Sequence, residues 1–120
     1  MQIQIDNFLV NMQVKKDGKK EYYYLEDFGF IRDSNYAPIT TKLFDVLDFI
    51  ELLKAWVGNK LNVENSYKIA NLEAKQTNKT KENFLRISFD FGEVLFLDKF
   101  QCMKLSSKLQ KVLNKVEIFG

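Results

Sequence analysis

The segment ITTKLFDVLDFI at residues 39–50 aligns without gaps with LSSKLQKVLNKV at residues 105–116. Four of the twelve aligned pairs are identical, and several others exchange similar residues, such as Thr for Ser. The tripeptide Asp-Phe-Gly also stands upstream of each segment, at residues 27–29 and 90–92. We interpret the pattern as a duplication, in which each half of the chain needs the other half to bury its apolar face.

Both aligned segments have the pattern of an amphipathic helix with a polar cap. Thr40 or Thr41 is expected to cap the first helix, which should run to about Val57. Two starts are open for the second helix. Asp98-Lys99-Phe100-Gln101 has the form of a capping box, whereas the duplication places the start at Ser106 and leaves the preceding residues extended. We follow the duplication and expect the second helix to begin at Ser106.

Alternating apolar and polar residues predict the strands. In the first half these are residues 2–14, residues 21–26 and a short strand around residues 30–31. In the second half they are residues 67–74, 84–91 and 94–97. Asp17-Gly18 predicts a tight hairpin turn, a change of parity near Asp6-Asn7 suggests a bulge, and Asp27-Phe28-Gly29 is expected to form a turn.

These elements predict an α+β fold. Antiparallel strands are expected to be covered on one face by two helices, in a pseudo-duplicated βββ(β)α plan. A chain of 120 residues corresponds to one domain, 1–120, with halves at about 1–58 and 66–120. Hydrophobic residues make up 46% of the chain and include eleven Phe, which is enough for a packed core.

The composition argues against several classes of protein. The chain has no histidine and one cysteine, Cys102, so neither a Cys/His zinc site nor a Ser-His-Asp system can form. Its carboxylates are scattered, and no phosphate-binding glycine loop is present. We therefore expect neither an enzyme nor a cofactor. No membrane segment or secretory leader is expected, and a single cysteine suits the reducing cytoplasm.

The first hairpin carries a candidate binding face. A turn at Asp17-Gly18 pairs Gln13 with Tyr22, Asn11 with Tyr24 and Lys15 with Lys20, which places these side chains on one side of the sheet. Aromatic rings can stack with bases and ammonium groups can bind phosphates, as single-stranded nucleic acid requires. The other interpretation is that tyrosine is simply common in strands and tolerates the surface.

Two further clusters are basic. The second helix carries lysines at helical spacing, namely Lys104, Lys108, Lys111 and Lys115. They could bind phosphates or an acidic partner, or they could form an ordinary solvated face. The polar loop 76–83 contains Lys79 and Lys81 and has Lys75 and Arg86 close by in sequence. It could clamp nucleic acid or serve as a plain hairpin loop.

The first helix is more apolar than the second. Its extra apolar side chains are Phe44, Phe49, Leu52 and Trp56. This strip is a candidate interface, for a homodimer or for another protein, because large exposed apolar patches are rarely without a function. Burial of the strip within its own domain is the alternative.

A local pattern in the second half supports a resemblance to known proteins. It runs from Gly92-Glu93-Val94-Leu95-Phe96-Leu97 through Lys104-Leu105-Ser106-Ser107 to Leu109 and Leu113. A turn, an apolar strand and a Leu-Ser-capped helix in this order resemble the whirly-type single-strand binders, which include the Pur-alpha repeat proteins and the positive-cofactor coactivators. The resemblance implies that lysines and aromatic residues bind single-stranded DNA or RNA across strand faces. The matching positions are Lys15, Lys20, Tyr22, Tyr24, Arg86 and Lys99.

The sequence therefore favours a small non-enzymatic protein that binds single-stranded DNA or RNA. A composition rich in Lys, Asn, Ile and Phe suggests an origin in an AT-rich bacterium, a phage or a mobile element. The expected location is the cytoplasm of a bacterial or phage-infected cell. The alternative is a protein-binding module, such as a phage inhibitor or adaptor that docks on a host protein.

Overall fold

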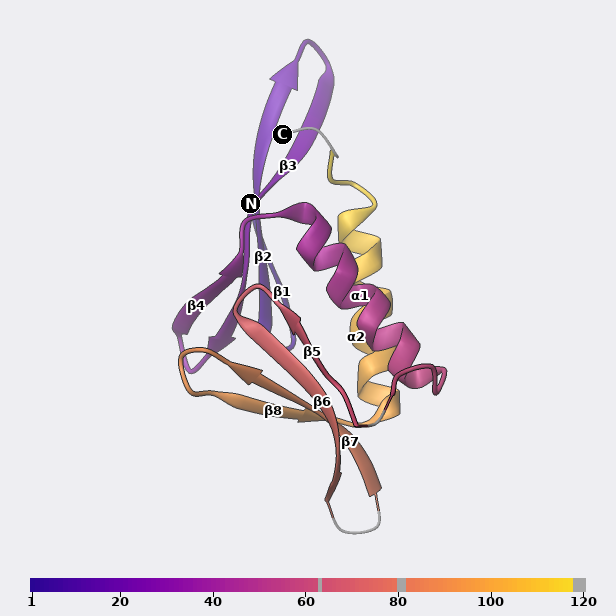
Figure 1. Cartoon of the computed structure of the whole chain (residues 1–120). Coiled ribbons are helices and arrows are strands. Elements are labelled where there is room, and N and C mark those ends of the chain that lie inside the picture. Colours follow the sequence, from indigo (N-terminus) through magenta and orange to yellow (C-terminus); the bar gives the residue numbers. More distant parts are fainter. Residues whose placement is uncertain (63, 80–81, 118–120) are drawn as a thin grey trace.

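The computed structural model describes residues 1–62, 64–79 and 82–117 (Figure 1). The first half consists of β1 (Gln2–Ile5), β2 (Phe8–Asp17), β3 (Lys20–Arg32), β4 (Asn35–Thr40) and α1 (Leu43–Val57). The second half consists of β5 (Ser66–Ile69), β6 (Leu72–Lys79), β7 (Glu82–Phe89), β8 (Val94–Leu97) and α2 (Lys99–Leu113). Strands β1–β4 form sheet A and strands β5–β8 form sheet B, both antiparallel and both in chain order. The α+β fold and its duplicated plan are confirmed.

The duplication is clearest in the first turn of each half. In sheet A, Ile5 pairs with Phe8 across Asp6-Asn7, and in sheet B, Ile69 pairs with Leu72 across Ala70-Asn71. Asp6 and Ala70 both have positive φ, at 52° and 50°. A two-residue connection with positive φ suits the twist of a tight hairpin. The change of parity at Asp6-Asn7 is therefore a turn between two strands, and the expected bulge in a single strand 2–14 is wrong.

The expected start of the second helix at Ser106 is also wrong. The Asp98 carboxylate accepts a hydrogen bond from the Gln101 backbone N–H (2.7 Å), and Gln101 Oε1 accepts one from the Asp98 N–H (2.9 Å). This capping box begins α2 at Lys99, because it satisfies N–H groups that have no partner within the helix. Ser106 is buried within α2, and its hydroxyl donates to the Met103 carbonyl.

The shared tripeptide does not mark equivalent positions. Asp27-Phe28-Gly29 lies inside β3, which continues to Arg32, so the turn expected there is wrong. Asp90-Phe91-Gly92 does lie in the connection between β7 and β8, where Gly92 has a φ of 95°. Most of the expected loop 76–83 belongs to a hairpin, in which β6 continues to Lys79 and β7 begins at Glu82. The residues between these two strands lie outside the described part of the chain.

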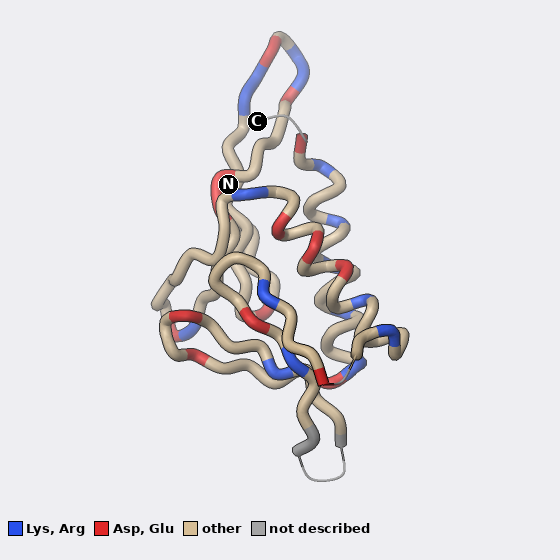
Figure 2. The backbone as a smooth tube through the Cα atoms, viewed as in Figure 1, with Lys and Arg blue, Asp and Glu red and all other residues tan. Residues whose placement is uncertain are grey.

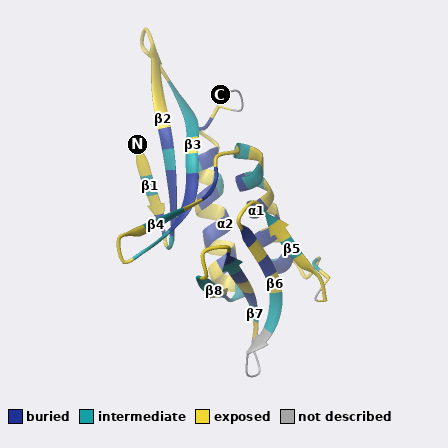
Figure 3. Ribbon diagram, turned by 60° about the vertical axis from the view of Figure 1, so that its left-hand side comes forward, coloured by how far each residue is buried: buried dark blue, intermediate teal, exposed yellow. Residues whose placement is uncertain are grey.

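The two halves share one hydrophobic core. Phe8 of sheet A is fully buried, and its ring contacts those of Phe28, Phe49 and Phe89, with centroids 5.4, 5.4 and 6.4 Å away. The helices pack side by side in opposite directions, next to both sheets (Figure 1). The buried residues gather where the strands meet this helix pair, whereas the outer end of the β2–β3 hairpin is exposed (Figure 3).

Candidate nucleic-acid interface

The β2–β3 hairpin places its polar and aromatic side chains on the side expected from the sequence. The turn residues are Gly18 and Lys19, and Lys15 pairs with Tyr22 while Gln13 pairs with Tyr24. The predicted pairs are thus shifted by two residues. Because side chains alternate with a period of two, this shift leaves every residue on the same side. We call the resulting surface the tyrosine face; its members are Gln13, Lys15, Lys20, Tyr22 and Tyr24.

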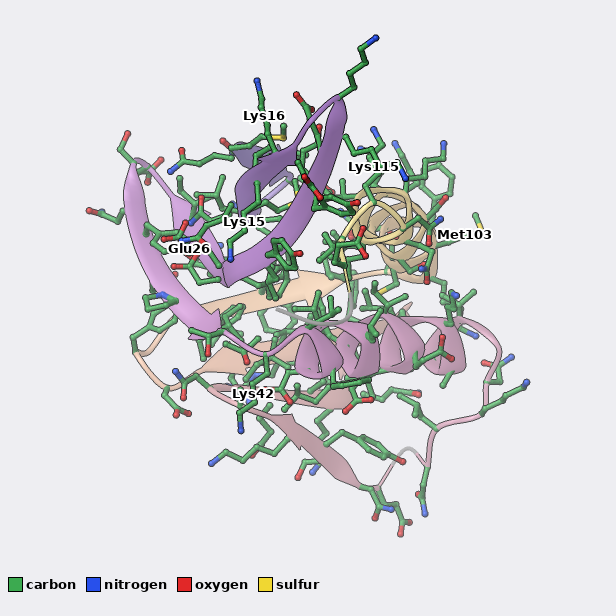
Figure 4. All side chains as sticks on the ribbon, turned by 90° about the horizontal axis from the view of Figure 1, so that it is seen from above. Lys15, Lys16, Glu26, Lys42, Met103 and Lys115 are labelled. Carbon is green, nitrogen blue, oxygen red and sulfur yellow. The ribbon has the colours of Figure 1, made fainter. Side chains whose placement is uncertain are left out.

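The tyrosine face points away from the helices. Figure 4 shows Lys15 on the opposite side of the sheet from α2, which carries Met103 and is followed by Lys115. At the edge of β3 away from β2, the Tyr23 carbonyl accepts a hydrogen bond from the Glu117 N–H (2.7 Å), and Tyr23 forms a parallel bridge with Val116. Tyr23 is therefore held by the segment after α2, while Tyr22 and Tyr24 remain half-buried and accessible.

A lysine holds one ring of this face in place. Lys15 Nζ lies 5.0 Å from the centroid of the Tyr24 ring, within the range of a cation–π contact. Lys15 is exposed, so its ammonium group can still bind an anion. An aromatic platform and a phosphate-binding cation thus lie next to each other on one surface.

A third tyrosine extends the outer side of sheet A, and the sequence reasoning missed it. The Tyr36 hydroxyl of β4 donates to Asp27 Oδ1 (2.6 Å), and Asn11 Nδ2 donates to the same oxygen (2.5 Å). Burial, together with the hydrogen bond to Asp27, raises the pKa of Tyr36 far above its usual value, because both disfavour the phenolate. The available signal was Gly29 between Phe28 and Phe30, because a glycine within a strand often marks a close approach of other groups.

Replacing Gly29 with alanine is expected to displace the Tyr36 ring. A Cβ atom at Gly29 would lie 2.5 Å from the Cζ and hydroxyl oxygen of Tyr36, far inside van der Waals contact. Overpacking of this kind costs about 1–3 kcal/mol, which urea denaturation would measure. The matched double variant Gly29→Ala, Tyr36→Ala removes the ring and should lose little beyond Tyr36→Ala alone. An additive loss in the double variant would contradict the proposed clash.

The other two predicted nucleic-acid-binding residues lie elsewhere. Arg86 is on the outer side of sheet B, where it pairs with Lys75 of β6 and Phe96 of β8. Lys99 connects the two helices: its Nζ donates to Asn59 Oδ1 and lies 5.9 Å from the centroid of the Trp56 ring. The structure therefore brings together four of the six predicted residues, and Arg86 and Lys99 are outside the tyrosine face.

The expected apolar interface on α1 lies mostly inside the chain. Phe49, Leu52 and Trp56 are buried in the shared core, and Trp56 Nε1 donates to Gln76 Oε1 of the second half (3.1 Å). These three side chains cannot reach a partner while the core is intact, because α1 is covered by its own domain. Phe44 alone is at the surface, with 66% of it exposed.

Positive charge gathers at the hairpin end of the molecule. The lysines of the β2–β3 hairpin and those in the last part of α2 and beyond lie near the same end (Figure 2). The group, which we call the basic end, contains Lys15, Lys16, Lys19, Lys20, Lys111 and Lys115. Against Asp17, Glu21, Glu26 and Glu117 the net charge of this region is +2, equal to that of the whole chain. The Lys16–Glu21 pair is exposed and spans 3.8 Å, so it neutralises little.

Comparison with known proteins leaves the interface to be judged from its geometry. No family model and no curated protein matches the chain. Among the described residues, no group of three or more Cys, Asp or Glu side chains could hold a metal ion. Over the same residues, neither helix is long and apolar enough to cross a membrane.

Proposed function

We propose that this protein binds single-stranded DNA or RNA on the tyrosine face and the basic end. The observation that carries the proposal is the arrangement around Lys15, which lies opposite Tyr22 and over the ring of Tyr24 on the outer side of sheet A. Single-strand binders combine such rings with a positively charged track, because every base has a flat face and every nucleotide has a phosphate.

The tyrosine face provides two successive positions for stacking. Tyr22 and Tyr24 are two residues apart on β3, so their Cα atoms are separated by about 7 Å along the strand. Phosphates beside the stacked bases would meet Lys15 and Lys20, and the strand would continue toward the other lysines of the basic end. Tyr36 offers a further ring on the same side of sheet A.

The plan of the fold supports the same proposal. Each half consists of four antiparallel strands followed by a helix, an order that resembles the whirly-type single-strand binders, although Leu105-Ser106-Ser107 lies inside α2 and does not cap it. We propose a non-enzymatic role, in the cytoplasm of a bacterial or phage-infected cell.

Fluorescence anisotropy with a labelled single-stranded oligonucleotide tests the proposal. If the ligand contacts four lysines, the logarithm of affinity should fall with the logarithm of salt with a slope of about −2.8. Raising salt from about 50 mM to about 200 mM should then weaken binding about 50-fold. DNA and RNA strands of one sequence give the preference, and the matched duplex is the control. An absence of binding in about 50 mM salt would exclude the proposed function.

A further inference from the structure

Among the described residues, the two most exposed phenylalanines lie outside the proposed nucleic-acid interface. Phe44 on α1 is 66% exposed and Phe100 on α2 is 61% exposed. Both lie in the first turn of a helix. The neighbouring side chains are acidic around Phe44 and basic around Phe100. Large apolar side chains at the surface of a small protein often mark a contact with another molecule.

The surface around Phe44 is acidic. Phe44, Asp48 and Glu51 follow one another at helical spacing and form an exposed stripe on α1, which we call the acidic stripe. Glu51 contacts Lys54 at 3.6 Å, but both side chains are largely exposed, so this pair is weak. Asp45 accepts a hydrogen bond from the Thr40 hydroxyl (2.6 Å) and is therefore already engaged within the chain.

The surface around Phe100 is a groove with a basic rim. It runs between α2, β8 and the turn at Asp6-Asn7, and its volume of about 360 Å³ exceeds that of a phenylalanine side chain. The residues that matter here are Leu95, Leu97, Phe100, Lys104 and Lys108. Lys104 Nζ lies 5.3 Å from the centroid of the Phe100 ring, and Lys108 is 3.9 Å from Asp6 in a pair of half-exposed side chains.

We propose that the groove of one copy of this protein binds the acidic stripe of a second copy. On α1 the order is Phe44, Asp48, Glu51, with spacings of four and three residues; on α2 it is Phe100, Lys104, Lys108, with spacings of four and four. Two such helices laid side by side in the same direction bring phenylalanine to phenylalanine and carboxylates to ammonium groups. A single contact thereby covers both exposed rings and pairs both sets of charges.

The contact joins two different surfaces, so the assembly is head-to-tail when the contact forms once between two copies. In each chain α1 packs on β4 and β5, whereas α2 packs on β1 and β8, and the stripe and the groove are separate. A heterologous contact of this kind extends from copy to copy. If the proposed function holds, this contact would place successive copies of the protein along one nucleic-acid strand and make their binding cooperative. Self-association itself does not depend on that function.

Charge reversal tests the contact with the full chain. The first variant, Asp48→Lys with Glu51→Lys, makes the stripe basic; the second, Lys104→Glu with Lys108→Glu, makes the groove acidic. All four residues are exposed, so both variants should fold, which circular dichroism checks. Sedimentation velocity over a concentration series should show that the parent self-associates in low salt and that each variant alone associates at least about tenfold more weakly.

The decisive sample is the equimolar mixture of the two variants. The basic stripe of the first variant can bind the acidic groove of the second, and the unchanged stripe of the second can bind the unchanged groove of the first. The mixture should therefore associate as the parent does. A monomeric parent in low salt, a variant that associates as well as the parent, or a mixture that stays monomeric would each overturn the inference. Binding of a short oligonucleotide is measured separately, so a failure of self-association is distinguished from a failure of the proposed function.

Discussion

Replacing Phe8 with alanine is expected to lower the free energy of unfolding by about 3–5 kcal/mol. Phe8 is fully buried, and its ring contacts phenylalanines from sheet A, from α1 and from sheet B. Alanine would leave a cavity where the two halves meet, and neither half can close it without moving the other. Small proteins are typically stable by about 5–15 kcal/mol, so this loss is a large share of the total.

Urea denaturation followed by tryptophan fluorescence measures this loss, because Trp56 is buried in the same core. Phe44→Ala is the matched control: it removes the same side chain from an exposed site on α1 and should change stability by no more than about 0.5 kcal/mol. Equal losses in the two variants would show that the core is not organised around Phe8.

Replacing Tyr22 and Tyr24 together with alanine is expected to weaken binding of a single strand by at least about 30-fold. Each base stacked on an aromatic ring contributes about 1–3 kcal/mol, and the variant removes two such rings. Both tyrosines lie on the side of the hairpin away from the helices and are only half-buried, so the fold should persist. Anisotropy in low salt measures the change, with circular dichroism as the check on folding.

Tyr23→Phe is the matched control for this variant. Tyr23 lies between the two tyrosines in sequence but on the opposite side of β3, and its hydroxyl donates to Glu21 at the surface (2.9 Å). Removing that hydroxyl should leave the affinity unchanged. If the double variant is folded and binds like the parent, the tyrosine face is not the binding surface.

The sequence pattern predicted the fold class and the composition of the tyrosine face for a common reason. Both depend on alternation along the chain, and alternation is unaffected when the hairpin register is wrong by two residues. The expected start of α2 was wrong because the alignment of the two halves of the chain was preferred to the local capping signal. Asp98 and Gln101 contain the whole signal, since a capping box needs only four consecutive residues.

Other features depend on packing that no local pattern specifies. Trp56 is buried in the shared core, and Gln76, in the other half of the chain, accepts the hydrogen bond of its indole N–H. Tyr36 joins the outer side of sheet A because Gly29, seven residues earlier, leaves room for its ring. In each case the tertiary structure brings the neighbouring residue close. The composition of the chain and the spacing of its residues therefore do not predict whether these two aromatic side chains are buried or exposed.

The shared core also bears on how such a chain could have arisen. If the two halves come from duplication of one ancestral segment, a single four-strand-and-helix unit would have exposed to water the apolar face that now contains Phe8 and Phe89. Such a unit would be stable only against another copy of itself. The founding protein was then a pair of identical chains, and gene fusion freed each half to change on its own. The acidic surface of α1 and the basic surface of α2 are differences that identical subunits could not have carried.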